Sequence, residues 1–375
     1  MLLENGLLFV DGRFIRASVR TAGGRITGIG DLTPEAGERV YDCGGNHVLP
    51  GFVDIHIHAY GGADCMRGEA DVRAMSRGLL ETGTAAFVPT TMSATKEETR
   101  SALSGIQAVC DRQEPSGAAV LGAHMEAPFL NPSYKGAQRE ECLMAPSAEA
   151  YGQLTRGIRC VRMMTLAPEL PGATELIRTL AARGIVTCAA HSGASAEDIH
   201  AAADAGLTQI THLFNAQTPL HHRKPGIPGA GLADDRILVQ MIADGIHLHP
   251  DVLRIAALCK GSKGVALISD SMEAAGLPEG EYELGGQRVI VKGGAARLES
   301  GVLAGSTLVL HRAVTNMIRL AGMSPETVIP MATRTPADSV GAAEYGRIEP
   351  GAVGIFALMD GNWDYAGVVD TRTAP

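Results

Sequence analysis

The chain has 375 residues, a formal net charge of −9, and a composition of 45% hydrophobic and 19% charged residues. This acidic balance argues against a nucleic-acid-binding surface. The absence of a run of ~18 apolar residues argues against a membrane span. Charged residues interrupt the apolar N-terminus, so we expect no signal peptide. Seven scattered cysteines, without a Cys-x-x-Cys pair, predict reduced thiols and a cytoplasmic protein.

The two ends of the chain share a sequence pattern of short apolar runs separated by turns. Residues 7–10 and 13–15 flank Asp11-Gly12, and residues 352–359 and 365–369 repeat the pattern near the C-terminus. Such runs are typical of antiparallel strands. We therefore predict a small β-sandwich domain that combines residues 1–50 with residues 346–375.

Between these ends, over residues 51–345, strand and helix patterns alternate. The first strand leads to His56 and His58, and seven further strands are predicted at residues 84–90, 119–125, 159–166, 185–191, 208–213, 238–246 and 265–269. Helical periodicity lies between most of them, for example at residues 71–82, 96–111, 173–183 and 196–205. Eight strands alternating with helices predict an α/β fold, a parallel (β/α)8 TIM-like barrel.

The first barrel strand ends in the pair His56 and His58. Because strand side chains alternate, both imidazoles point to the same side and are able to grip one metal ion. Two histidines in a loop without a ligand are the alternative. The Gly-rich exit after His58 favours a barrel mouth, and therefore a metal site.

Polar side chains follow most of the predicted strands. A buried imidazole or carboxylate is usually just hydrogen-bonded, so each one alone is weak evidence for a site. Together they are hard to explain by packing, because buried charged groups are costly without partners. The strand-end residues are His56, His58, His124, Glu126, His191, His212, Asn215, Asp244, His247 and Asp270.

The segment His221-His222-Arg223-Lys224 is the one cluster of positive charge. A solvated loop is the simple interpretation of an isolated basic run. Its position just after the strand that ends at His212 favours phosphate binding, because a guanidinium presents a planar fork to phosphate oxygens. Such a loop can also reach a neighbouring subunit.

Several of these segments together resemble the N-acetylglucosamine-6-phosphate deacetylases of the amidohydrolase superfamily. The resemblance covers nearly the whole chain and implies a (β/α)8 barrel with a small β domain. It also implies metal-dependent removal of the acetyl group from N-acetylglucosamine 6-phosphate. The matching stretches are residues 50–58, 124–129, 135–138, 165–169, 190–195, 211–216, 221–226, 242–247, 269–272 and 303–306.

The resemblance also implies roles for individual residues. Glu126, His191 and His212 correspond to ligands of the principal divalent ion, and His56 and His58 to ligands of a second ion. Zinc is expected first, with iron, manganese or cobalt as alternatives. Asp270 corresponds to the catalytic acid and base, which would take a proton from water and return it to the leaving amine. The implied substrate contacts are Ala137, Gln138, Asn215, Ala216, Arg223, His247, Leu303, Ala304 and Gly305, with His222 serving a neighbouring subunit of a homodimer.

Two positions depart from the family pattern. Ala127 replaces a usual Gly and could narrow the site, and Lys224 replaces a usual Glu beside the phosphate anchor. An apparent hairpin at residues 281–297 is expected to form a lid. The sequence does not separate the glucosamine, galactosamine and mannosamine phosphates.

Two alternative functions fit parts of this pattern less well. Cyclic-amide hydrolases of the same superfamily need a Lys at the end of the fourth strand, and none stands at residues 164–167. Glu126 is able to supply the bridging carboxylate instead. A non-enzymatic barrel protein would be expected to have lost Asp270 or a metal ligand.

Overall fold

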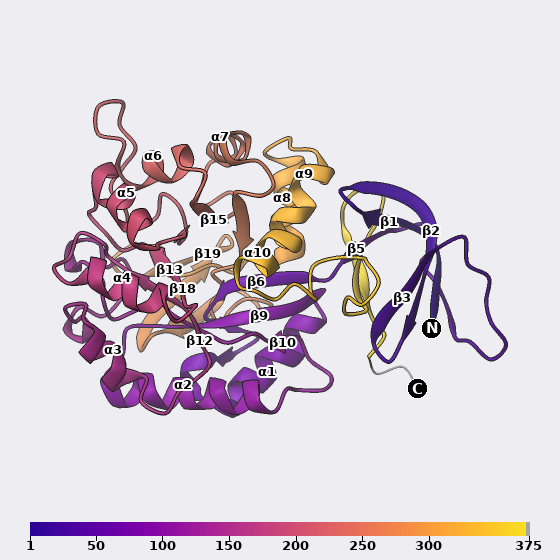
Figure 1. Cartoon of the computed structure of the whole chain (residues 1–375), viewed down its shortest axis with the longest axis horizontal. Helices are drawn as coiled ribbons and strands as arrows, with labels where there is room; N and C mark the ends of the chain where they lie inside the picture. Colours follow the sequence, from indigo (N-terminus) through magenta and orange to yellow (C-terminus); the bar gives the residue numbers. More distant parts are fainter. Residues whose placement is uncertain (373–375) are drawn as a thin grey trace.

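The computed structural model describes residues 1–372. A barrel surrounded by helices forms the larger part of the molecule, and a smaller sheet from both chain termini stands beside it (Figure 1). The division into residues 1–50 with 346–375 and residues 51–345 remains our proposal, and residues 373–375 lie outside the described part.

The smaller part is one seven-stranded sheet in the order β21-β20-β5-β1-β2-β3, with β4 beside β1. Its strands are β1 (Leu2–Val10), β2 (Arg13–Ala22), β3 (Arg25–Gly30), β4 (Val40–Asp42), β5 (His47–Pro50), β20 (Ile355–Met359) and β21 (Tyr365–Asp370). The expectation of a purely antiparallel sheet is wrong in one respect, because β1 pairs in parallel with both β4 and β5.

This sheet curls around a single core. Leu3, Val19 and Ile26 from one side of the sheet share a buried cluster with Phe356 and Val369 from the other. The backbone also joins the two edges, since Ile26 N donates to the carbonyl of residue 352 at 2.9 Å. The curled sheet thereby encloses its apolar face as a sandwich does, which is why two distant chain segments form one unit.

The barrel strands run parallel in the predicted order. They are β6 (Phe52–Ile57), β9 (Thr84–Thr91), β10 (Ala119–Val120), β11 (Ala123–Met125), β12 (Val161–Leu166), β13 (Val186–Ala189), β14 (Gln209–Ile210), β15 (Leu238–Ile242) and β16 (Val265–Ile268). The predicted third strand is split into β10 and β11, which both pair with β9. Gly122 lies at the break with φ +142°, and a Cβ there would come within 2.6 Å of the Cys160 carbonyl oxygen. A strand cannot continue regularly through such a backbone.

The first and last barrel strands meet at the mouth. Asp270 N donates to the His56 carbonyl at 2.9 Å, and the Asp54 carboxylate accepts from the backbone N–H groups of His56 and Ser269 at 3.3 Å each. Burial raises the pKa of Asp54 to about 6, against the lowering effect of these hydrogen bonds. Asp54 therefore orients the backbone where these two strands meet.

Helices cover the outside of the barrel (Figure 1). They are α1 (Glu69–Leu80), α2 (Lys96–Asp111), α3 (Ala148–Leu154), α4 (Ala173–Ala181), α5 (Ala196–Ala205), α6 (Gly226–Ala233), α7 (Pro250–Lys260), α8 (Leu310–Arg319), α9 (Pro325–Ala332) and α10 (Arg334–Ser339). Thr95 and Ser195 begin α2 and α5 with reciprocal capping boxes, and both helices have the bounds that the sequence predicts. None of the helices described in residues 1–372 is long and apolar enough to cross a membrane.

The remaining elements lie at the barrel mouth. They are β7 (Ala59–Tyr60), β8 (Ala63–Asp64), η1 (Cys65–Arg67), η2 (Pro132–Tyr134), η3 (Glu140–Cys142), β17 (Gly280–Leu284), β18 (Gln287–Lys292) and β19 (Ala295–Leu298). The last three strands form an antiparallel sheet, so the segment expected as a hairpin has a third strand. We call β17–β19 with the following loop to Gly305 the lid.

Candidate active site

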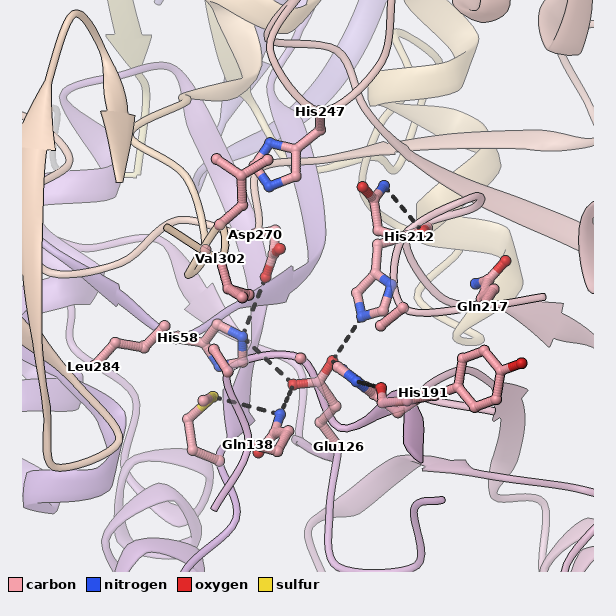
Figure 2. A pocket seen from close by; sticks show the side chains of 18 of the residues that line it. His58, Glu126, Gln138, His191, His212, Gln217, His247, Asp270, Leu284 and Val302 are labelled. Carbon is pink, nitrogen blue, oxygen red and sulfur yellow. Dashed lines mark hydrogen bonds and ion pairs between the residues drawn. The ribbon is translucent and has the colours of Figure 1, made fainter. Parts of the chain in front are cut away.

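Six buried side chains from five barrel strands meet at the C-terminal end of the barrel, where TIM barrels place their chemistry. Figure 2 labels His58, Glu126, His191, His212 and Asp270 among them. His191, His212 and Asp270 follow β13, β14 and β16 with φ values of +48°, +31° and +50°. Non-glycine residues rarely adopt this left-handed region, and such strain concentrates at functional sites. The chain thus turns sharply at each strand end and aims the side chain into the mouth.

The first group of potential ligands is Glu126 with His191 and His212. Glu126 Oε1 lies 3.3 Å from His191 Nε2 and 3.0 Å from His212 Nε2. The Nδ1 atom of His191 lies 3.0 Å from the Tyr134 carbonyl, which fixes the ring with Nε2 toward the carboxylate. These contacts hold one face of Glu126 against two imidazoles.

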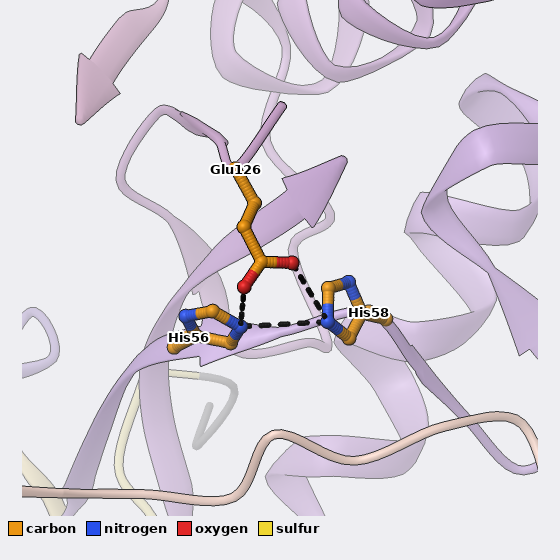
Figure 3. A group of neighbouring side chains, drawn as sticks. All are labelled: His56, His58 and Glu126. Carbon is orange, nitrogen blue, oxygen red and sulfur yellow. Dashed lines mark hydrogen bonds and ion pairs between the residues drawn. The ribbon is translucent and has the colours of Figure 1, made fainter. Parts of the chain in front are cut away.

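The second group is Glu126 with His56 and His58 (Figure 3). His56 Nε2 lies 3.6 Å from Oε1 and His58 Nε2 lies 3.6 Å from Oε2, while the two imidazole nitrogens are 3.4 Å apart. His58 Nδ1 lies 2.9 Å from the Thr90 carbonyl at the end of β9. The Glu126 carboxylate therefore stands between the two histidine pairs, and each group keeps its ligand atoms within 4.8 Å of one another.

Asp270 joins the second group. Its Oδ1 lies 3.2 Å from His56 Nε2 and 3.1 Å from His58 Nε2. Burial would raise the pKa of Asp270, but the two imidazoles outweigh it and hold that pKa well below its usual range. Burial also opposes protonation of His58, yet Asp270 and Glu126 raise its pKa to about 9. Asp270 is therefore ionised at neutral pH.

The donor set fits divalent cations. Imidazole nitrogens and carboxylate oxygens suit zinc, iron, manganese and cobalt. All four Nε2 atoms point at the shared carboxylate, and the Nδ1 atoms of His56 and His212 are buried without a hydrogen-bond partner within residues 1–372. A buried cluster of this kind is costly unless a cation or protons balance its carboxylates.

Gln138, which is predicted as a substrate contact, also forms a direct hydrogen bond with Glu126 of this cluster. Its Nε2 donates to Glu126 Oε2 at 2.7 Å, and its Oε1 accepts from Ser93 N at 2.7 Å. Both ends of the amide are thus occupied, and Glu126 is oriented by a side chain that is itself fixed. No sequence motif pointed to Ser93, which follows β9.

His124 is a strand-end histidine outside both groups. Its Nε2 lies 2.8 Å from Thr165 Oγ1, and its Nδ1 lies 3.3 Å from the Ile55 carbonyl. Burial keeps its pKa well below the usual value, so the ring is neutral. Its ring packs against that of His56 with centroids 4.9 Å apart, and it supports that ligand from inside the barrel.

A cavity of about 470 Å³ opens above the cluster (Figure 2). His247 lines it, and Asp244 Oδ2 lies 2.7 Å from His247 Nδ1, so the other ring nitrogen is left for a ligand. Burial would raise the pKa of Asp244, but this contact lowers it overall. The other predicted substrate contacts that line the cavity are Ala137, Gln138, Asn215, Ala216, Leu303 and Gly305.

Three predicted contacts lie outside this cavity. Arg223 and His222 are exposed and do not line the cavity, and Arg223 Nη1 lies 2.7 Å from His222 Nε2. Ala304 is fully buried in the core under the lid, because its neighbours Leu303 and Gly305 face the cavity. Within one chain, therefore, these three residues do not meet the ligand space that the sequence predicts for them.

The two departures from the family pattern also lie away from the cavity. Ala127 is buried but does not line it, so its methyl group does not narrow the ligand space. Lys224 is exposed and closes a turn, with its N–H donating to the His221 carbonyl at 3.0 Å.

Comparison with known proteins assigns the chain to a family. A family model described as the amidohydrolase family matches residues 47–373. The chain belongs to the amidohydrolase family. It is 36% identical over 363 residues to the N-acetylgalactosamine-6-phosphate deacetylase of Escherichia coli O157:H7, covering 96% of this chain and 95% of that one.

Two further relatives carry the name N-acetylglucosamine-6-phosphate deacetylase. The protein from Bacillus subtilis strain 168 is 38% identical over 300 residues, which is 78% of this chain and 75% of the relative. The crystal structure of the Thermotoga maritima protein superposes with a TM-score of 0.88 at 32% identity, covering 99% of this chain and 98% of that one. The barrel and its attached sheet are therefore the fold of this group of amidohydrolases.

Proposed function

We propose that the protein hydrolyses the N-acetyl group of N-acetylglucosamine 6-phosphate, giving glucosamine 6-phosphate and acetate. The observation that carries this proposal is the pair of ligand groups sharing Glu126, with Asp270 beside them, at the base of a 470 Å³ cavity. The names of the relatives support the choice of a sugar phosphate.

Glu126, His191 and His212 would hold a principal divalent ion, and His56 and His58 would hold a second one beside it. Zinc is our first choice of ion, with iron, manganese or cobalt as alternatives. A divalent ion bound in this site would lower the pKa of a water molecule and would polarise the acetyl carbonyl. Gln138 and Tyr134 keep the ligands oriented, as outer hydrogen-bond partners do in metal sites.

Asp270 moves the proton. Contacts with His56 and His58 hold its pKa well below the usual range, and a divalent ion held by those histidines would favour the same ionised form, which is able to accept a proton from the attacking water. The same carboxyl then donates that proton to the departing amine, so one group serves both steps. His247, whose Nδ1 is held by Asp244, is placed to form a hydrogen bond with the substrate through its other ring nitrogen.

We propose that the predicted phosphate anchor Arg223 acts across a subunit interface. His221, His222 and Arg223 are exposed and do not line the cavity of their own chain, which supports a role at the neighbouring subunit of a homodimer. We further propose that the protein acts in the cytoplasm, in line with its scattered, free cysteines.

N-acetylgalactosamine 6-phosphate is the second candidate substrate, because the E. coli relative of that name matches 96% of this chain. A cyclic-amide substrate is disfavoured, since Thr165 and Leu166 end β12 without a lysine and no lysine of residues 1–372 lines the cavity.

Acetate release from a panel of substrates tests the function. The panel contains N-acetylglucosamine, N-acetylgalactosamine and N-acetylmannosamine 6-phosphates, with dihydroorotate as the cyclic amide, each with zinc-loaded protein. We expect the highest kcat/KM for N-acetylglucosamine 6-phosphate. A higher value for the galacto epimer would replace the proposed substrate, and turnover of dihydroorotate alone would refute the reaction class.

A further inference from the structure

Glu169 is a half-buried carboxylate that the proposed function does not use. It follows β12, at the end of the matching stretch 165–169, and it is the only ionisable residue of that stretch. It does not line the cavity and belongs to neither ligand group. A carboxylate withdrawn from water is costly unless its oxygens are hydrogen-bonded, so the partners of Glu169 indicate what it does.

Both carboxylate oxygens of Glu169 accept hydrogen bonds, and the donors come from two separate segments. Oε1 accepts from Asn131 Nδ2 at 2.8 Å and from Gly193 N at 2.6 Å, and Oε2 accepts from Ser192 Oγ at 2.6 Å. Ser192 and Gly193 directly follow the ligand His191, and Asn131 begins η2. Hydrogen bonds to an ionised acceptor are short and strong. The carboxylate therefore clamps the start of η2 to the residues after β13.

The clamped segments hold both the backbone and the ring of His191. Asn131 N donates to the His191 carbonyl at 2.9 Å, and Tyr134 N donates to the Asn131 carbonyl at 2.9 Å. The Tyr134 carbonyl in turn lies 3.0 Å from His191 Nδ1, which keeps the ring beside Glu126 (Figure 2). His191 has φ +48°, a strained conformation for a residue with a side chain, and it persists only where the surroundings enforce it. Glu169 is thus one hydrogen bond removed from the contacts that fix this ligand.

The other histidine pair is supported from elsewhere. His58 Nδ1 lies 2.9 Å from the Thr90 carbonyl, and the rings of His56 and His124 have centroids 4.9 Å apart. Thr90 lies in β9 and His124 in β11, outside the segments that Glu169 clamps. A change at Glu169 should therefore act on one ligand group and spare the other.

We propose that Glu169 is a positioning residue that holds His191 in place to ligate the principal divalent ion. This inference rests on the proposed function, which places that ion in the first ligand group. The three donors to Glu169 are an amide, a backbone N–H and a hydroxyl, so Glu169 supplies hydrogen-bond acceptors rather than a partner for a cation. A glutamine side chain keeps one acceptor oxygen for Asn131 and Gly193, and its NH2 group is able to donate to the Ser192 hydroxyl. A leucine leaves all three donors without this partner.

Cobalt(II) binding to three variants tests the inference. A chelator competition measures both affinities, and anomalous diffraction identifies the histidine pair that each ion occupies. We expect Glu169→Leu to weaken binding at the first ligand group about 10–100-fold, as the loss of an outer hydrogen-bond partner does in metal sites. Affinity at the second group should stay within about threefold of the wild type, because its supports are separate. Glu169→Gln should stay within about threefold at both groups, because it keeps the hydrogen bonds.

Gln113→Leu is the matched control for a general loss of stability. Gln113 holds Val120 through two hydrogen bonds of 2.9 Å and does not line the cavity, so its loss should leave both cobalt affinities at wild-type values. Asn131→Asp replaces Glu169→Leu if the leucine variant does not fold. It keeps the shape of the side chain but places a second carboxylate opposite Glu169 Oε1, and we expect the same selective loss at the first group.

The outcomes separate this inference from the proposed function. Equal weakening at both ligand groups, wild-type affinity in Glu169→Leu or Asn131→Asp, or a Glu169→Gln variant as weak as Glu169→Leu would overturn the positioning role. The proposed function would still stand if the wild-type protein releases acetate. Wild-type protein that neither binds cobalt nor releases acetate would overturn both.

Discussion

The substitution Asp270→Asn separates proton transfer from metal binding. The substitution preserves the shape of the side chain, whose Oδ1 lies 3.2 and 3.1 Å from His56 and His58, but removes its ability to accept a proton. General acid–base catalysis contributes about 10²–10⁴-fold to rate. Because Asp270 serves both the water and the amine, we expect the upper part of that range. This is a fall in kcat of about 10³–10⁴, equivalent to ~4–5.5 kcal/mol.

The assay is steady-state acetate release with metal content measured on the same sample. We expect KM within about threefold of the wild type and unchanged metal content, because Glu126 and the histidines remain. Asp251→Asn is the matched control, since Asp251 is exposed at the start of α7 and does not line the cavity. A kcat for Asp270→Asn above a tenth of the wild-type value would refute the proton-transfer role.

Three further substitutions test the supports of the site and the fold. Gln138→Leu should weaken metal affinity about 10–100-fold in a chelator competition, because Glu126 loses its 2.7 Å hydrogen bond, and unchanged affinity would contradict this. Burial, with help from Arg312, lowers the pKa of His311 to about 4, below ~6.5 in the unfolded chain. The stability that neutral His311 contributes is therefore full above pH 6.5 and is lost as the pH falls toward 4. In urea unfolding, we expect the free energy of unfolding to be ~1–2 kcal/mol lower at pH 5 than at pH 7. This decrease should be smaller in His311→Phe. Gly122→Ala should cost ~2–3 kcal/mol in the same assay, because it combines φ +142° with a clash at Cys160, and a loss below ~0.5 kcal/mol would refute that strain.

Hydrophobic periodicity and helix N-caps were enough to predict much of the fold. Helices at residues 96–111 and 196–205 have their predicted bounds, because Thr95 and Ser195 are strong local start signals. The break at Gly122 was not predictable in this way, since it follows from the approach of the Cys160 carbonyl, which lies just before β12. The parallel pairing of β1 with β4 and β5 likewise depends on tertiary contacts rather than on local pattern.

The candidate site was likewise predictable from local sequence pattern only in part. Alternation and strand-end position were enough to bring His56, His58 and Glu126 to one place. They did not reveal that Arg223 lies outside its own cavity, because the direction of an exposed loop has no periodic signal.

The shared use of Glu126 by two cations is the central claim, and anomalous diffraction from zinc-loaded crystals tests it most directly. We predict two peaks, one beside His191 and His212 and one beside His56 and His58, with the Glu126 carboxylate between them. Peaks that make no contact with Glu126 would contradict the claim.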